Sequence, residues 1–123
     1  MLYEKTVINL RVASTFVTRL KGLLGRRVMA DNEALWLLRC PAVHTFGMRF
    51  DVSICFIDEH CSIVRLYPRV PPGSILWCPG ASSVIERVAL STNASSNPCL
   101  HPDIEELMLL VRQANSTRSS PAF

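Results

Sequence analysis

Cys40 and His44 lie four positions apart and are the residues of this sequence that most suggest covalent chemistry. A thiolate beside an imidazole can attack an electrophilic carbon once the imidazole has taken the thiol proton. The base must lie about 3 Å from the sulfur, and a segment broken by Pro41 does not by itself provide that geometry. No third residue is identifiable to orient the imidazole. We therefore interpret Cys40 as a buried thiol and His44 as a loop histidine, and keep an enzyme that uses this pair as the alternative.

A metal site would need three or four converging ligands. The sequence offers Cys40, His44, His60 and Cys61, but the last two are adjacent and the chain has no Cys-x-x-Cys motif. The glycine-rich phosphate-binding, dinucleotide-binding and serine-hydrolase motifs are also absent. We therefore expect no metal and no other cofactor.

A second group of residues indicates binding rather than catalysis. The segment from Val43 to Phe50 is an apolar loop around a glycine, with Phe46 and Met48 on either side of Gly47. A glycine lets the backbone pass close to another surface. We expect this loop to fold over a sheet edge or a barrel mouth, against one of the protein's own tryptophans or against a ligand.

Two charged residues complete the predicted site. Arg49 lies in the same loop, and Glu86 lies in a later apolar segment. A partly buried ion pair between them would contribute specificity as much as stability. The predicted ligand-binding residues are therefore Phe46, Gly47, Met48, Arg49 and Glu86.

Short strands must position these residues. Alternating apolar side chains over 6–12 predict a half-buried strand, and the apolar run 34–39 predicts a buried one. The two runs around the turn at 58–61 predict a hairpin. The remaining expected strands are 52–57, 62–67, 74–78 and 83–89, with a proline-rich loop between the second and the third.

Two segments have helical spacing. Apolar residues over 16–24 predict a short N-terminal helix that Gly25 ends, and those over 104–111 predict a C-terminal helix that Pro102 can open. We therefore predict an α+β, β-rich fold with an antiparallel, partly closed, barrel-like sheet. One domain covers 1–112, and the polar residues 113–123 form a flexible tail.

Composition limits the compartment and the class of partner. Of the 123 residues, 49% are hydrophobic, and the five cysteines are an odd number. Neither a secretory signal nor a run of about eighteen apolar residues is visible, so we expect a soluble, cytoplasmic protein. The net charge is only +3, and Phe16 is the one aromatic residue beside the basic cluster from Arg19 to Arg27. An RNA-binding barrel is therefore the weaker alternative.

Four stretches come in an order that resembles a known family: TRLKGLLGRRV at 18–28, EALWLLRCPAVHTFGMRF at 33–50, ICFID at 54–58 and GASSVIE at 80–86. The resemblance is to the small bacterial and archaeal proteins called domain of unknown function 192 (DUF192), and it covers about residues 6–103. It implies a compact β-rich fold with a short N-terminal helix. It implies no established activity.

The chain departs from that family pattern at several positions. After Met-Arg-Phe the family has Pro, an apolar residue and Asp, where this chain has Asp51, Val52 and Ser53. The family acid therefore falls on Ser53. The hairpin turn usually carries a glycine where this chain has Cys61, and the Pro and Gly that usually follow Glu86 are lost.

These observations favour a non-enzymatic module that binds a small molecule or a protein through the loop 43–50. No membrane or nucleic-acid partner is expected. The oligomeric state is left open.

The turn residue gives a first prediction. If Cys61 takes a positive φ, its side chain costs roughly 1 kcal/mol relative to glycine. We predict that Cys61→Gly raises the melting temperature measured by thermal unfolding. A lower melting temperature would show that the turn is built differently.

Overall fold

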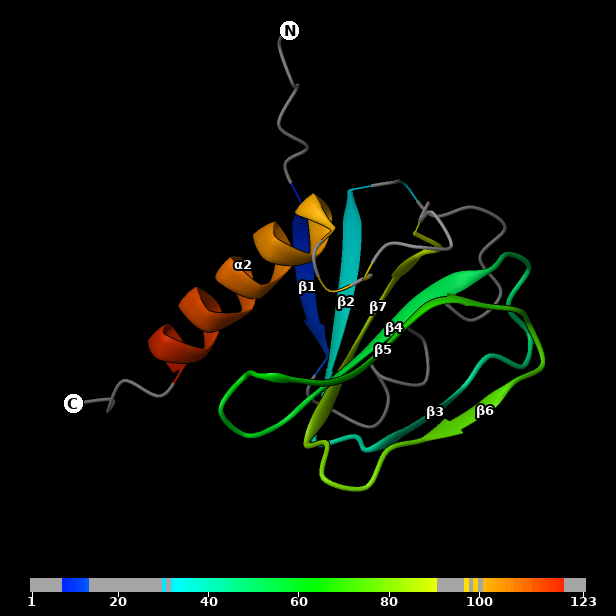
Figure 1. Cartoon of the computed structure of the whole chain (residues 1–123), viewed down its shortest axis with the longest axis horizontal. Helices are drawn as coiled ribbons and strands as arrows, with labels where there is room; N and C mark the ends of the chain where they lie inside the picture. Colours follow the sequence, from blue (N-terminus) through cyan, green and yellow to red (C-terminus); the bar gives the residue numbers. More distant parts are fainter. Residues whose placement is uncertain are drawn as a thin grey trace, which may run out of the picture.

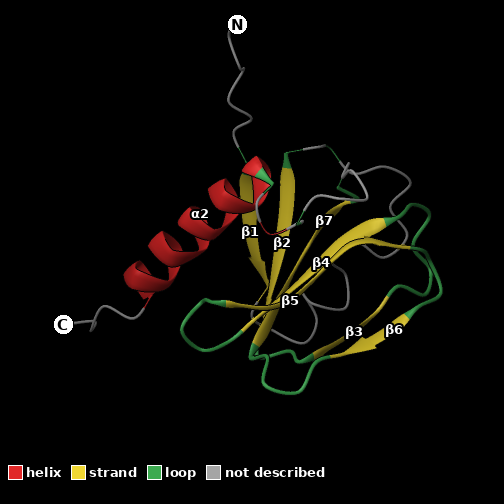
Figure 2. Cartoon of the chain, viewed as in Figure 1, coloured by secondary structure: helices red, strands yellow, loops and turns green. Residues whose placement is uncertain are grey.

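The computed structural model describes residues 8–13, 30, 32–90, 97, 99 and 101–118. These residues form a mostly β structure with one C-terminal helix, α2 (Figures 1 and 2). The N-terminal helix predicted over 16–24 lies outside the described residues. The strands are β1 (Asn9–Ala13), β2 (Glu33–Leu38), β3 (Ala42–His44), β4 (Val52–Ile57), β5 (Ile63–Val70), β6 (Ile75–Trp77) and β7 (Ser83–Val88).

The strands form two sheets. The larger has five strands in the order β1-β2-β7-β4-β5, and β3 pairs with β6 in a separate two-stranded ribbon. The larger sheet is not closed, because β1 and β5 are its edges, so the barrel-like closure that we expected is not found among the described strands. Nor is it purely antiparallel, since β1 runs parallel to β2. A parallel pair needs a crossover of a dozen or more residues, and the segment 14–32 is long enough for one.

Most of the predicted strands are present, and the differences have physical reasons. β4 occupies the predicted 52–57, whereas β5 continues through Pro68, which we had placed in a loop. A proline is tolerated there because β5 is an edge strand with one side free of ladder bonds. The Pro68 carbonyl accepts a hydrogen bond from the N–H of Leu90 at 2.9 Å.

The C-terminal helix is confirmed as α2 (Pro102–Arg118). Proline suits its first position, and Asp103 and Glu105 in the first turn complement the helix dipole. The imidazole of His101 accepts a hydrogen bond from the Asp103 N–H at 3.1 Å and so caps the helix. The helix continues six residues beyond the predicted boundary at 112, so residues 113–118 belong to it rather than to a flexible tail.

Both faces of the large sheet are covered, so β4 is buried at every position. Successive side chains of a strand point to opposite faces. Cys55 and Ile57 therefore pack in one apolar cluster with Leu107 of α2, whereas Ile54 and Phe56 belong to a second cluster on the other face. Residues of the ribbon and its flanking loops that join this second cluster are Val43, Met48, Leu76 and Cys78.

An ion pair ties the start of α2 to the sheet. Arg87 of β7 is only 1% exposed and lies on the helix side, in register with Ser53 of β4. Its Nη1 atom lies 3.6 Å from Oδ2 of Asp103. Ser53, on which the resemblance places an acid, is therefore the β4 neighbour of a buried cation, whose carboxylate partner comes from α2.

The turn between β4 and β5 has the predicted strain, since Cys61 has a φ of 59°. Oδ1 of Asp58 accepts hydrogen bonds from the N–H groups of Ser62 and His60, both at 2.9 Å, and these bonds lower the pKa of Asp58. The Cys61 side chain is buried, so Cys61→Gly has two opposite effects: it relieves the backbone strain, and it removes packing contacts. Cys61→Ala loses the thiol but keeps the strain, and is the control that separates the two effects.

Candidate functional site

Thr45 fixes the loop 43–50 to the loop before β6. The Thr45 side chain is buried, and its Oγ1 donates a hydrogen bond to the Pro71 carbonyl and accepts one from the Ser74 N–H, both at 2.8 Å. Its N–H donates to the Ser74 carbonyl at 2.8 Å, and its carbonyl accepts from the Gly73 N–H at 3.1 Å. Four hydrogen bonds through one residue therefore join the two loops that carry β3 and β6.

The ribbon β3–β6 has one buried face and one face in water. Val43 and Leu76 point inward, into the second apolar cluster. Paired residues of antiparallel strands share a face, so Ala42 lies beside Trp77, and His44 beside Ile75, on the outer face. The side chains of the outer face project away from the large sheet.

Three large apolar side chains are exposed here. Ile75 is 71% exposed, Trp77 69% and Phe46 48%. The Phe46 ring lies on the His44 ring with a centroid distance of 5.4 Å. We call His44, Phe46, Ile75 and Trp77 the arm surface. A cluster of exposed apolar residues on a folded domain usually marks an interaction site.

The predicted loop residues divide between the two faces. Phe46 is on the outside, and Met48 is buried beneath the ribbon in the second apolar cluster. Gly47 has a φ of 83°, which a glycine adopts without a steric cost. Arg49 is exposed. The loop therefore packs partly on its own protein while it presents Phe46 to solvent.

The predicted ion pair between Arg49 and Glu86 is not formed in the described part of the chain. Glu86 is 3% exposed and lies in the middle of β7, in register with Leu35 and Ile54. It points to the face opposite Arg87, because neighbours in a strand alternate. Burial raises the pKa of Glu86 from 4.5 to about 7. The prediction failed because the sequence could not show that Glu86 occupies a central, doubly covered strand.

Cys40 and His44 do not act on each other. The Cys40 side chain is half-buried rather than buried as predicted, and its thiol donates a hydrogen bond to the Ala42 carbonyl at 2.8 Å. The His44 ring lies on Phe46 on the outer face of the ribbon. No hydrogen bond joins the two side chains where the structure describes them. The arrangement gives no support to nucleophilic chemistry at Cys40.

No group of three or more His, Cys, Asp and Glu residues in the described ranges could hold a metal ion. No helix of the described structure has both the length and the apolar character needed to cross a membrane.

Ile75 and Trp77 were not among the predicted site residues. Ile75, Leu76 and Trp77 are all apolar, so the sequence does not tell which side of that strand faces water. The available signal is the length of the segment between Pro72-Gly73 and Pro79-Gly80. A strand this short has little room for pairing in a large sheet.

A family model described as DUF192, Uncharacterized ACR, matches residues 2–96. The chain therefore belongs to the DUF192 family, as its motifs predicted. No curated protein matches the chain.

Two solved structures are similar to this one. A protein described as a "putative transcription regulator" from Sinorhizobium meliloti 1021 has a TM-score of 0.61 and 20% identity, and the match covers 67% of this chain and 69% of that one. A protein of unknown function from Novosphingobium aromaticivorans DSM 12444 has a TM-score of 0.60 and 20% identity, with 67% and 64% covered. These similarities concern the fold alone.

The buried Glu86 predicts a pH dependence of stability. Its pKa of about 7 in the folded state lies above its ordinary value of 4.5, so the unfolded chain loses this proton first as pH rises. Stability should therefore fall between about pH 4.5 and pH 7, by about 3 kcal/mol from this group. Glu86→Gln should remove that fall and be more stable than wild type at pH 8.

Denaturant unfolding at a series of pH values measures this effect. Glu59→Gln is the matched control, because Glu59 is exposed and should leave the wild-type profile unchanged. A profile of Glu86→Gln that falls in parallel with wild type would show that Glu86 is not the group responsible.

Proposed function

We propose that this DUF192 member is a non-enzymatic binding module whose arm surface docks an apolar segment of a partner protein. The observation that carries the proposal is the exposure of Phe46, Ile75 and Trp77 on one side of the ribbon. Burying a large apolar side chain is worth roughly 1.5–3 kcal/mol. Three such side chains on one face are a substantial source of affinity.

The rigidity of the β3–β6 ribbon supports the same function. Binding costs less when the surface is already ordered, because fewer side chains and loops lose freedom on association. The hydrogen bonds of Thr45 hold the ribbon to the loops at its ends. Trp77 is the residue type most often found at the energetic centre of an interface.

The charges near the arm suggest the chemistry of the partner. Arg49 is exposed three residues after Phe46, and no described residue forms an ion pair with it. Arg69 of β5, in contrast, is already paired with Asp51 at 2.7 Å. The Arg49 guanidinium can therefore form an ion pair with a carboxylate of the partner. We infer that the partner segment carries apolar side chains followed by an acidic residue.

Labelled peptides in which apolar and polar residues alternate, with or without a flanking glutamate, test the proposal by fluorescence anisotropy. We expect saturable binding that Trp77→Ser weakens about tenfold or more. Arg49→Gln should weaken only the peptides that carry glutamate. The control is Leu109→Ser, which also replaces an exposed apolar residue by serine but lies on α2. It should bind the peptides like wild type.

Two results would contradict the proposal. One is that no peptide of this kind binds. The other is that Trp77→Ser and Ile75→Ser bind as well as the Leu109→Ser control.

A further inference from the structure

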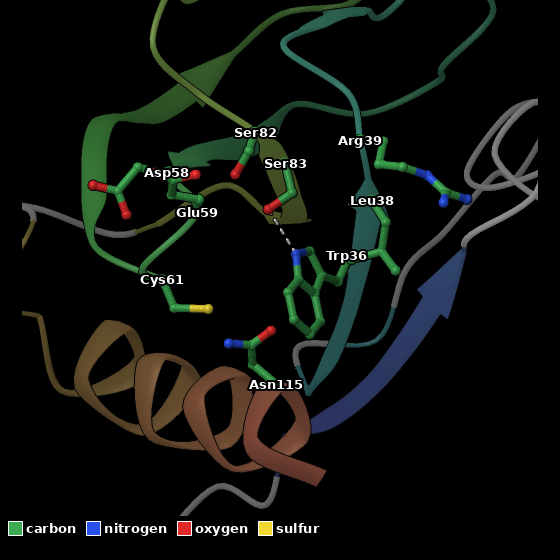
Figure 3. A pocket seen from close by; sticks show the side chains of 9 residues that line it. All are labelled: Trp36, Leu38, Arg39, Asp58, Glu59, Cys61, Ser82, Ser83 and Asn115. Atoms are coloured by element: carbon green, nitrogen blue, oxygen red, sulfur yellow. Dashed lines mark hydrogen bonds between the residues drawn. The ribbon is translucent and has the colours of Figure 1, made fainter. Parts of the chain in front are cut away.

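A small pocket lies on the helix side of the large sheet, away from the arm surface. It is bounded by the end of β2, the β4–β5 turn, the start of β7 and the C-terminal half of α2 (Figure 3). Its volume is about 170 Å³. An engineered apolar cavity of roughly 150 Å³ holds a benzene molecule, so this pocket suits a ligand of about six to eight non-hydrogen atoms.

The inner wall of the pocket is polar but uncharged. Figure 3 shows Trp36, Cys61 and Asn115 pointing toward a common space, with Ser82 and Ser83 above it. The Trp36 indole N–H donates a hydrogen bond to Ser83 Oγ at 2.9 Å, which holds the ring in place. The Trp36 ring is only 2% exposed, so it forms the fixed floor of the pocket.

Two polar side chains of this wall are available to a ligand. In the described part of the chain, neither the Asn115 amide nor the Ser82 hydroxyl makes a hydrogen bond. The Ser82 backbone, in contrast, is engaged by Ile57 and Cys40. An amide and a hydroxyl can each donate and accept, so they match a partner that also does both.

The charged residues of the pocket lie at its rim. Figure 3 shows the Arg39 side chain directed away from the space in front of Trp36, and the Asp58 carboxylate at the outer edge. The third charged lining residue, Glu59, has a side chain that is 80% exposed and lies 3.5 Å from His60. Asp58 is also committed to its own turn through the N–H groups of His60 and Ser62. A charged ligand would therefore lose its hydration without finding a counter-charge inside.

The backbone around the pocket is strained. Arg39 has a φ of 53° and Cys61 a φ of 59°, and they are the non-glycine residues with positive φ among those the structure describes. Both line this pocket. Strained backbone conformations gather at binding and active sites, where surrounding contacts hold them for a functional geometry.

We propose that this pocket binds a small neutral polyol of three or four carbons. The hydroxyl groups exchange hydrogen bonds with Asn115 and Ser82, above the floor that the buried indole of Trp36 forms. The proposal is independent of the protein-binding function of the arm surface, because the two sites share no residue.

Titration of the Trp77→Phe variant with glycerol and erythritol tests this assignment. The chain has two tryptophans, so this surface substitution leaves Trp36 in the pocket as the sole tryptophan reporter. We expect a saturable change in Trp36 emission, with chemical-shift changes confined to the pocket residues. Glycerate and 2-amino-1,3-propanediol, which are charged and of similar size, should bind about tenfold more weakly.

Variants of α2 separate binding from a change in folding. In the Trp77→Phe background, Asn115→Ala should weaken polyol binding about fivefold, the effect of losing one hydrogen bond. Gln113→Ala, on the exposed side of the same helix turn, should not. Asn115→Asp should reverse the preference toward the amino analogue.

The proposal is overturned by any of three results: no saturation with either polyol, equal affinity for the charged analogues, or unchanged affinity in both Asn115 variants. None of these results would bear on peptide binding at the arm surface.

Discussion

The buried hydroxyl of Thr45 is the constraint on which the candidate binding surface depends. A three-residue strand pair has too few ladder hydrogen bonds and too little buried area to be stable alone. Thr45 adds bonds from both its backbone and its side chain to the loop before β6, while Val43 and Leu76 attach the ribbon to the core. With the inner face used for packing, the outer face is free to carry Phe46, Ile75 and Trp77.

The central strands explain how the two faces of the molecule differ. β4 and β7 are buried on both sides, so consecutive residues of β7 meet different surroundings. Arg87 faces α2 and reaches Asp103, whereas Glu86 faces the ribbon side, where burial raises its pKa to about 7. The helix side carries the polar pocket and the ribbon side carries the arm surface, and the sheet separates them.

Sequence patterns were sufficient where one physical rule dominates. The apolar run 52–57 became β4 with the predicted bounds, and helical spacing located α2. The positive φ of Cys61 followed from a turn that usually carries glycine. The patterns were insufficient where tertiary context decides: an edge position admits Pro68 into β5, and β1 pairs with β2 in parallel. The site shows the same division. The loop was identified, whereas Ile75 and Trp77 were not, and Glu86 lies buried in a central strand without the predicted ion pair to Arg49.

Hydrogen–deuterium exchange of Thr45→Val, compared with wild type, tests the central claim that Thr45 orders the β3–β6 ribbon. Valine keeps the shape of threonine but leaves the Ser74 N–H without its side-chain partner, and it removes one of the two hydrogen bonds that the Pro71 carbonyl accepts, the other coming from Ser74 Oγ. We predict faster exchange in β3, β6 and the loop before β6, with β4 and β7 as protected as in wild type. Unchanged protection of β3 and β6 would contradict this account, and so would an equal loss of protection across the whole sheet.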